Sequence, residues 1–355
     1  MTDLLDRTAE LVDIRSESHC EAAITDHIEG LLRADAPWFE LDRLGHNLVA
    51  RTRLGLSSRV IIAGHTDTVP VNGNMPARRH GDELWGCGAA DMKAGLATMI
   101  ELARTVDAPA VDVTLVFYEA EEVAAVHNGL GRLFRERPDL ITGDVALLGE
   151  PTDGSIEAGC QGTMRVEVIL NGERAHTARP WMGRNAIHRL AGVLQSLADY
   201  EGRRPVIEGC EYREAMQAVA IEGGVAGNVV PDRARLVVNH RFAPDRGADE
   251  AAIHVRSVVG ADLDAGDSFD VVDMAPAAAP GLDHPLLRAL IARHHLPVRA
   301  KLGWTDVARF AAHGIPAANF GPGDANLAHT RDERVRLEPI ERVYHALVDV
   351  VRRGA

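Results

Sequence analysis

The chain has 355 residues, and a single hydrophobic core usually stops growing below this size, so two domains are expected. Apolar residues make up 46% and charged residues 25% of the sequence, which is ordinary for a folded protein and excludes a disordered or collagen-like chain. The formal net charge is -14 and no run of clustered Lys and Arg occurs, which argues against nucleic acid as a partner.

The cysteines and the N-terminal segment bear on the cellular compartment. The four cysteines are far apart and form no CxxC pair, so neither a disulfide framework nor a cysteine zinc site is predicted. Acidic residues interrupt the N-terminus where a signal peptide would be apolar, and no run approaches the ~20 apolar residues of a membrane span. We therefore expect a cytoplasmic protein that does not bind membranes.

The first part of the chain alternates between helical and strand patterns. Apolar spacing predicts two opening helices, one through residues 4–12 and one through residues 24–32. Strands are then predicted at "NLVAR", "RVIIAG", "VDVTLVFYEA" and "DVALLGE", with helices at "MKAGLATMIELARTV" and "GLGRLFRERP". This alternation is typical of an α/β domain with helices on both faces of a mainly parallel or mixed sheet.

The pattern changes to a ferredoxin-like order in the middle of the chain. Strand "MRVEVIL", helix "RNAIHRLAGVLQSLADY", strands near "MQAVAIEGG" and "ARLVVNHRF", helix "ADEAAIHVRSVVG" and strand "FDVVDMAP" follow one another as βαββαβ. The run "APAAAPGLDHP" reads as a linker, after which α/β signals resume up to a C-terminal helix from about Glu338. We expect an inserted α+β domain over residues 164–279, and an α/β domain over residues 1–163 and 280–355.

Imidazoles and carboxylates follow several predicted strands at the point where each strand ends. Ligand sites of open α/β sheets lie at the carboxyl ends of the strands. A mixed set of nitrogen and oxygen donors suits zinc better than calcium or magnesium, and more than four ligands indicate two metals about 3.5 to 4 Å apart. The candidates are His65 and Asp67 in "GHTD", Asp91 in "GCGAADMKAG", Glu121 and Glu122 in "AEE", Glu150 in "LLGE", and His329 in "NLAHTRDE".

Each of these residues also has an ordinary structural interpretation. His65 could be a hydrogen-bonded loop residue, Glu150 could cap a turn, and Asp91 would be a good N-cap. The pair Glu121 and Glu122 differs, because adjacent carboxylates after an apolar strand repel each other and lose solvation unless a cation compensates them. The pair is therefore the more specific indication of a bound metal.

A series of short motifs carries a resemblance to a known family. In chain order they are "GHTDTVP", "GCGAADMKAG", "EE", "GEPT", "AHTARPWMGRNAIH", "GNVVPD" with "NHR", and "AHTRDE". The sequence resembles, over nearly its whole length, the dinuclear zinc deacylases and peptidases related to aminoacylase, acetylornithine deacetylase and succinyl-diaminopimelate desuccinylase. The resemblance implies a zinc-peptidase-like domain holding two zinc ions, or cobalt as a substitute. It implies that Asp91 bridges them, with His65 and Glu150 on one ion and Glu122 and His329 on the other.

The resemblance also implies roles for residues outside the ligand set. Glu121 would be the general base, and Asp67 would accept a hydrogen bond from the His65 ring and fix its tautomer. His176 would reach the site of a neighbouring subunit and stabilise the oxyanion, which implies a homodimer formed through the inserted domain. Two departures from the family pattern are Cys87, where many relatives have arginine, and Val123, where glycine commonly follows the Glu pair.

Arginine and amide side chains are the candidates for binding substrate carboxylates. An arginine fork matches a carboxylate bidentately, and relatives in the family use such groups, although each arginine here could equally be a surface charge. Arg241 in "VVNHRF" is the preferred candidate of the three arginines. The complete set comprises Arg179, Asn228, Arg241, Thr305 and Arg309.

The segment "LGWTDVARF" bears on the substrate, because it is similar to a Gly-Thr-Asp-Ala-Arg-Phe loop of the desuccinylases, with Trp304 in place of a small residue. The resemblance implies hydrolysis of N-succinyl-LL-2,6-diaminopimelate to succinate and LL-diaminopimelate. Acetylornithine deacetylation or general N-acyl-amino-acid hydrolysis is the alternative within the family. A dinucleotide-binding protein is disfavoured because no GxGxxG follows the first strands, and a metal-binding module without turnover is disfavoured because Glu121 is present.

Overall fold

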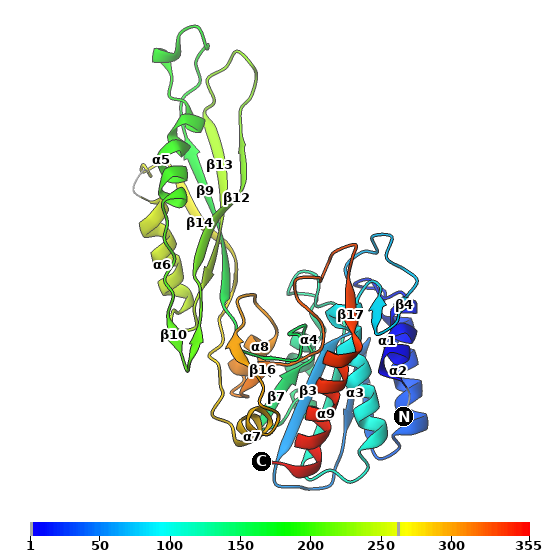
Figure 1. Ribbon diagram of the computed structural model, residues 1–355. Helices are drawn as coiled ribbons and strands as arrows, with labels where there is room; N and C mark the ends of the chain where they lie inside the picture. Colours follow the sequence, from blue (N-terminus) through cyan, green and yellow to red (C-terminus); the bar gives the residue numbers. More distant parts are fainter. Residues whose placement is uncertain (1–2, 261–262) are drawn as a thin grey trace. The chain divides into compact units, whose positions relative to one another are not determined.

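The computed structural model describes residues 3–260 and 263–355, and the chain divides into two compact units (Figure 1). Unit one consists of Met1–Ala158, Pro280–Arg299 and Arg309–Ala355, and unit two of Gly159–Ala279 and Ala300–Ala308. Residues 159–163 and 300–308 thus fall in unit two, whereas the sequence analysis placed them in the α/β domain.

A mixed eight-stranded sheet forms the centre of unit one, with strand order β1-β2-β6-β3-β7-β16-β8-β15. β3 runs parallel to β6 and β7, and β16 runs parallel to β7, whereas β1, β2 and β8 pair antiparallel with their neighbours. The α/β fold with a mixed sheet is therefore confirmed. The strands are β1 Glu40–Leu44, β2 Asn47–Arg51, β3 Arg59–His65, β6 Asp112–Tyr118, β7 Val145–Leu148, β8 Ile156–Ala158, β15 Val298–Ala300 and β16 Ala317–Asn319.

The helices of unit one pack on this sheet around a buried central helix. Ten of the twelve residues of α3 (Ala94–Thr105) are buried, and the helix contacts α1 (Leu4–Asp13), α2 (Ala22–Asp35), α9 (Leu337–Arg353) and β3. The strands β6 and β7 are buried along their whole length, as their continuous apolar runs predict for parallel strands covered on both sides. The other helices are α4 Gly129–Glu136, α7 Pro285–His294 and α8 Val307–Ala312.

Unit one also contains a small sheet that the sequence analysis did not predict. Its strand order is β17-β5-β4, with β4 at Arg78–His80, β5 at Glu83–Trp85 and β17 at Arg334–Arg336. Each strand has three residues, which is too short for an apolar alternation to be recognised. The sheet joins the segment before α3 to the segment before α9.

Unit two has the predicted ferredoxin-like order. β9 (Gly162–Asn171), α5 (Ala186–Ala198), β12 (Ala215–Gly223), β13 (Arg233–Phe242), α6 (Ala248–Val259) and β14 (Ser268–Ala275) follow one another, and the antiparallel sheet has the order β12-β13-β9-β14. Alternate residues of β9, such as Val166 and Val168, pack in one core with Val193 of α5 and Val255 of α6. A hairpin of two short strands, β10 (Val206–Ile207) and β11 (Cys210–Glu211), was not predicted from the sequence.

The length and apolar character of the helices bear on whether one of them could cross a membrane. Within residues 3–260 and 263–355, no helix combines the length and the apolar character that crossing a bilayer requires.

Candidate metal centre

The carboxyl ends of three parallel strands bring the predicted ligands of unit one together. His65 is the last residue of β3, where it lies opposite Tyr118, the last residue of β6. Glu121 and Glu122 follow β6 after a short turn, and Glu150 follows β7, which pairs with β3 on its other side. Because all three strands end at one edge of the sheet, their following residues converge there.

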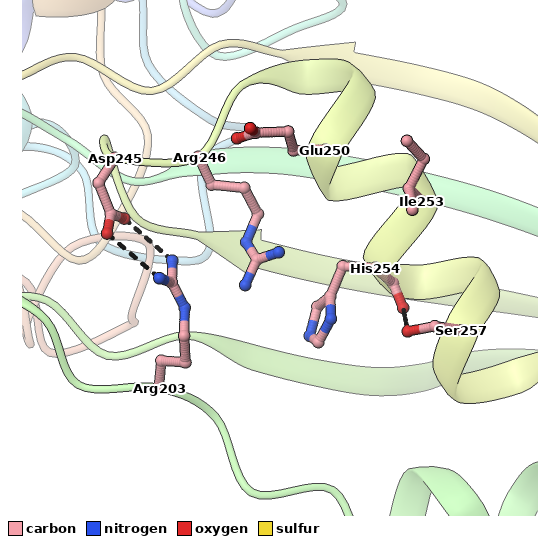
Figure 2. Close-up of a pocket in the computed structure, with 7 residues that line it drawn as sticks. All are labelled: Arg203, Asp245, Arg246, Glu250, Ile253, His254 and Ser257. Carbon is pink, nitrogen blue, oxygen red and sulfur yellow. Dashed lines mark hydrogen bonds and ion pairs between the residues drawn. The ribbon is translucent and has the colours of Figure 1, made fainter.

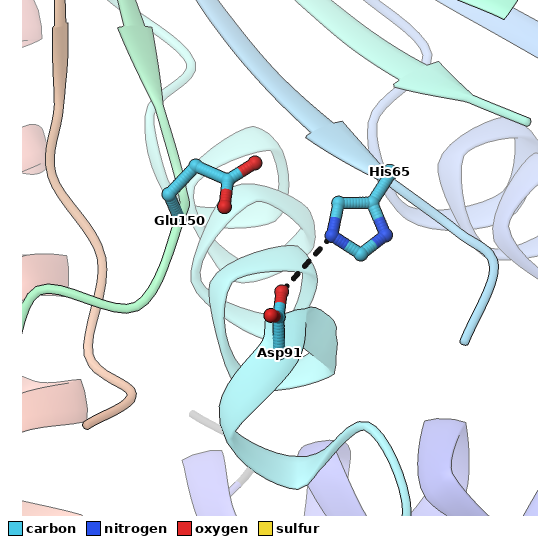
Figure 3. Close-up of side chains that lie close together, drawn as sticks. All are labelled: His65, Asp91 and Glu150. Atoms are coloured by element: carbon cyan, nitrogen blue, oxygen red, sulfur yellow. Dashed lines mark hydrogen bonds and ion pairs between the residues drawn. The ribbon is translucent and has the colours of Figure 1, made fainter. Parts of the chain in front are cut away.

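The first of two candidate ligand groups consists of His65, Asp91 and Glu150 (Figure 3). One ligand atom from each lies within 4.8 Å of the others, and His65 Nε2 lies 3.0 Å from Asp91 Oδ1. His65 and Glu150 are both buried. The buried carboxylate of Glu150 and the mostly covered carboxylate of Asp91, 13% exposed, lie beside one imidazole, an arrangement that favours a compensating positive charge.

The second group consists of Asp91, Glu122 and His329. His329 Nε2 lies 2.9 Å from Glu122 Oε1 and 3.5 Å from Asp91 Oδ2. His329 is about half exposed, so this group is the more open to solvent. Asp91 therefore belongs to both groups and presents one carboxylate oxygen to each histidine.

The charges of the cluster act on both histidines. Hydrogen bonds and charge from Asp91 and Glu122 raise the pKa of His329 to about 10. Burial alone would lower the pKa of His65, but its interactions with Asp67 and Asp91 raise it well above the ordinary value. Burial would raise the pKa of Asp91, but the two imidazoles hold it well below its usual range. Both shifts favour the protonated form of the imidazoles when no metal is bound.

The contacts of the Asp67 side chain differ from the predicted hydrogen bond to the His65 ring. His65 Nδ1 lies 3.0 Å from the backbone carbonyl oxygen of Asp67 and 3.5 Å from its carboxylate oxygen Oδ1, so the carbonyl is the closer acceptor for the ring. The carboxylate is turned toward the loop after β6, where Oδ1 accepts from the N–H of Glu121 at 3.0 Å and Oδ2 from that of Glu122 at 3.1 Å. Ser18 Oγ donates to Oδ2 at 2.7 Å. The Asp67 side chain therefore orients the glutamate loop more directly than it orients the His65 ring.

Glu21 holds the same loop and was not predicted. Its buried carboxylate accepts from the N–H of Ala120 at 3.0 Å and from that of His19 at 2.9 Å. Ala120 has φ +57°, which is uncommon for a residue other than glycine. Glu21 and Asp67 together bind three consecutive amides, 120 to 122. Nothing in the sequence indicates this, because a glutamate at the start of a helix is an ordinary surface residue.

The Asp67→Ala variant is expected to bind zinc or turn over substrate about 10–100-fold less well, because partners behind metal ligands have effects of this size. Competition with a chelator measures the zinc affinity. Asp112→Ala is the matched control, because Asp112 is also buried. Its carboxylate likewise accepts three hydrogen bonds, one from the Thr52 hydroxyl and two from the backbone N–H groups of Leu54 and Leu56. It lies at the opposite end of β6, so its loss should lower stability alone. Equal zinc affinity and equal turnover in both variants would contradict the role of Asp67.

The remaining predicted site residues are divided between the units. His176, Arg179 and Asn228 lie in neighbouring loops of unit two: Thr177 N–H donates to the Asn228 carbonyl at 3.0 Å, and Arg179 N–H donates to the His176 carbonyl at 2.8 Å. Their side chains are exposed. Arg241 lies on β13 and Thr305 also falls in unit two, whereas Arg309 belongs to α8 in unit one.

A groove of about 510 Å³ in unit two is lined by other residues (Figure 2). Arg203 pairs there with Asp245, and both Arg203 and Arg246 bind the buried carboxylate of Glu214. Burial would raise the pKa of Glu214, but the two guanidinium groups lower it to about 2. The two arginines of this groove are thus neutralised within the protein. Over the part of the chain that the structure describes, the groove is lined by none of the predicted site residues.

Comparison with known proteins identifies the family. The model of peptidase family M20/M25/M40 matches residues 61–353. The chain belongs to this family. The resemblance predicted from the motifs is therefore confirmed, and the dinucleotide-binding alternative is wrong.

Two curated relatives of this M20 chain are similar over almost their whole length. A putative succinyl-diaminopimelate desuccinylase of Mycobacterium tuberculosis is 54% identical over 352 residues, which are 99% of this chain and 97% of the relative. The succinyl-diaminopimelate desuccinylase of Corynebacterium glutamicum is 46% identical over 341 residues, 95% of this chain and 92% of the relative.

Solved structures of lower identity share the fold. An aminopeptidase of Bacillus cereus superimposes with a TM-score of 0.79 at 21% identity, covering 99% of this chain and 97% of that protein. A dinuclear metal-binding M20 peptidase of Bacillus subtilis has a TM-score of 0.71 at 19% identity, covering 99% and 98%. The predicted combination of an α/β domain with a ferredoxin-like domain thus agrees with the fold of M20 peptidases.

Proposed function

We propose that this M20 chain is an amide hydrolase that releases succinate from N-succinyl-LL-2,6-diaminopimelate and leaves LL-diaminopimelate. The observation that carries the proposal is the identity of 54% and 46%, over nearly full length, to two proteins named for this reaction. The geometry of unit one supports it, because the two ligand groups share Asp91. A reaction of this biosynthetic kind also favours a cytoplasmic location.

We infer that two zinc ions occupy the two groups, His65 and Glu150 holding one, Glu122 and His329 the other, and Asp91 both. Two imidazoles with carboxylate oxygens are a donor set that zinc accepts, and cobalt could replace it. The carboxylates of Asp91 and Glu122, which raise the pKa of His329 to about 10, support this assignment. Bound zinc would polarise the amide carbonyl and lower the pKa of water toward neutrality.

Glu121 would serve as the general base. It would take a proton from the attacking water while the C–O bond forms, and deliver it to the nitrogen as the C–N bond breaks. The products are then a carboxylate and a free amine. Its backbone is held by the Asp67 carboxylate at 3.0 Å, which limits the positions that its side chain can adopt.

Zinc loading is expected to release at least one proton per chain near pH 7.5. The pKa of His329 is raised to about 10, so its ring is protonated there, whereas a zinc-bound imidazole is neutral. The pKa of His65 is also raised, by Asp67 and Asp91. Apparent zinc affinity should therefore rise with pH up to about pH 10. A protonated His329 also stabilises the folded, metal-free protein. This stabilisation is fully present below the pKa that His329 has in the unfolded chain, and it is lost as the pH rises through about 10, the raised pKa in the folded protein.

Isothermal titration calorimetry in two buffers with different ionisation enthalpies measures the released protons. His345→Ala, which removes an exposed histidine of α9, should leave the number unchanged. Zinc binding without net proton release would contradict a protonated His329 that becomes a zinc ligand.

We infer that the chain forms a homodimer through unit two. β12 is an edge strand of its sheet, and its residues 217–223 are all exposed, including Val219 at 56% and Ile221 at 54%. A strand that is apolar, exposed on both faces and unpaired along one edge favours pairing with another chain. The dimer would allow His176 to serve the site of the partner.

The His176→Ala variant is expected to keep two zinc ions and lose about 10²–10³-fold in kcat, since loss of one oxyanion donor has an effect of this size. Metal analysis with steady-state kinetics tests this, and His345→Ala is again the control. Unchanged turnover would exclude the role of His176. A monomer at assay concentration in sedimentation experiments would exclude the partner's contribution.

Substrate carboxylates would be bound by Arg179, Asn228, Arg241, Thr305 and Arg309. Arg241 is the best supported, because its side chain is partly buried and, among the described residues, it forms no ion pair with a carboxylate. A half-buried guanidinium without a carboxylate partner is available to an anionic ligand.

The proposed function is tested by metal removal and return. The chelated protein should not release succinate from N-succinyl-LL-2,6-diaminopimelate, and adding zinc should restore the release. Succinate release that persists without metal would contradict the metal chemistry. A zinc-loaded protein that deacetylates N-acetylornithine in preference would favour the alternative function.

A further inference from the structure

Glu333 is a buried carboxylate that binds the loop carrying Asp91. It lies four residues after His329 and directly before β17. Its Oε2 accepts from the N–H of Gly88 at 2.9 Å, and its Oε1 accepts from the N–H groups of Ala90 and Asp91, both at 3.0 Å. One side chain therefore satisfies three amides of a four-residue stretch.

These amides need an acceptor because the turn before α3 is irregular. Gly88 has φ +78°, and Asp91 and Met92 have non-helical backbone angles. A regular helix would direct its N–H groups at carbonyls four residues earlier. Buried amides without such carbonyls are costly unless another group accepts their hydrogen bonds.

The backbone of Glu333 is tied to the same loop. Gly86 N–H donates to the Glu333 carbonyl at 3.1 Å, and the next residue, Arg334, pairs with Trp85 between β17 and β5. The segment that carries His329 and the segment that carries Asp91 are thus joined by strand pairing and by the Glu333 side chain. His329 Nε2 and Asp91 Oδ2 lie 3.5 Å apart next to this junction.

We propose that Glu333 is a positioning residue that sets the Asp91 carboxylate relative to His329. This inference rests on the proposed metal binding and deepens it. Asp91 is common to both ligand groups, so a shift of its backbone changes both metal positions at once. Glu333 acts through the amides of residues 88–91, and its carboxylate is occupied by them.

Glutamine cannot replace Glu333 in this role. A carboxylate offers two acceptor oxygens, whereas a glutamine side chain offers one acceptor and one NH2 donor. With its oxygen toward Ala90 and Asp91, a glutamine would place its NH2 against the N–H of Gly88. Aspartate retains both acceptors but is one methylene shorter, so it should reach only part of the loop.

The test compares Glu333→Gln, Glu333→Asp and the control Asp112→Asn for zinc affinity by chelator competition. The absorption spectrum of the cobalt-loaded proteins reports the coordination geometry, and the melting temperature of the metal-free proteins reports folding. Asp112 is matched as a buried carboxylate accepting backbone N–H groups, at the far end of β6. We expect Glu333→Gln to bind zinc about 10–100-fold more weakly with an altered cobalt spectrum, Glu333→Asp to be intermediate, and Asp112→Asn to match the wild type.

The outcomes separate this inference from the proposed function. Wild-type zinc affinity and cobalt spectrum in Glu333→Gln would overturn the positioning role while leaving the metal site intact. If Glu333→Gln does not fold, Glu333→Asp decides, and wild-type affinity in that variant would overturn the role. A wild-type protein that binds no metal would overturn the proposed function itself.

Discussion

Glu121→Gln is expected to lower kcat by about 10²–10⁴-fold, the usual contribution of a general base, with two zinc ions retained per chain. The amide of glutamine cannot accept the proton of the attacking water, whereas the proposed ligands do not include Glu121. The bond from its backbone N–H to Asp67 at 3.0 Å is unaffected by the substitution. Steady-state kinetics with metal analysis of the same sample measures both quantities.

Glu119→Gln is the matched control for this variant. Glu119 lies two residues earlier in the same loop, and its carboxylate accepts a hydrogen bond from Asn47 Nδ2 at 2.9 Å. The side-chain oxygen of a glutamine can accept the same hydrogen bond. The kcat of Glu119→Gln should stay close to that of the wild type. Equal kcat in Glu121→Gln and the wild type would exclude Glu121 as the base. Loss of zinc from the Glu121→Gln variant would instead indicate that Glu121 is a metal ligand.

Asp91→Ala is expected to reduce zinc binding at both positions, because Asp91 is the one residue common to the two ligand groups found among residues 3–260 and 263–355. Turnover should fall by more than about 10³-fold, since a single electrostatic donor already contributes about 10²–10³-fold. Glu150→Ala and Glu122→Ala each remove a ligand from one group, so each should weaken one position only.

Zinc stoichiometry and stepwise affinity distinguish these variants. The exposed Asp107 provides the control Asp107→Ala, which should bind two zinc ions like the wild type. Two tightly bound zinc ions in Asp91→Ala would contradict the shared position of this carboxylate. Loss of both ions in Glu150→Ala would show that the two positions are not independent.

The fold was predictable wherever an element is long enough to show a period. The strands β3 and β6 are continuous apolar runs, and α5, β12, β13 and α6 follow the βαββαβ order that their patterns indicate. The three-residue strands β5 and β17 were not predictable, because their pairing depends on residues about 250 positions apart. Strand patterns also do not reveal that Asn47 and Glu119 meet beside β6.

The ligand groups were predictable because of where the strands end. His65 ends an apolar strand, Glu122 and Glu150 follow such strands, and parallel neighbours deliver these residues to one edge. Of the residues that hold their loops, Asp67 was predicted, although as a partner of the His65 ring, and the others were not. Glu21 and Glu333 bind backbone amides, an interaction that depends on the folded path of the chain and not on a motif of its own.

The central claim is tested most directly by comparing kcat/KM of the zinc-loaded protein for N-succinyl-LL-2,6-diaminopimelate, N-acetylornithine and several N-acyl amino acids, with released acid counted against released amine. We predict the highest kcat/KM for the succinylated substrate, with one succinate formed for each amine. A higher kcat/KM for N-acetylornithine, or no hydrolysis of any of these amides, would contradict it.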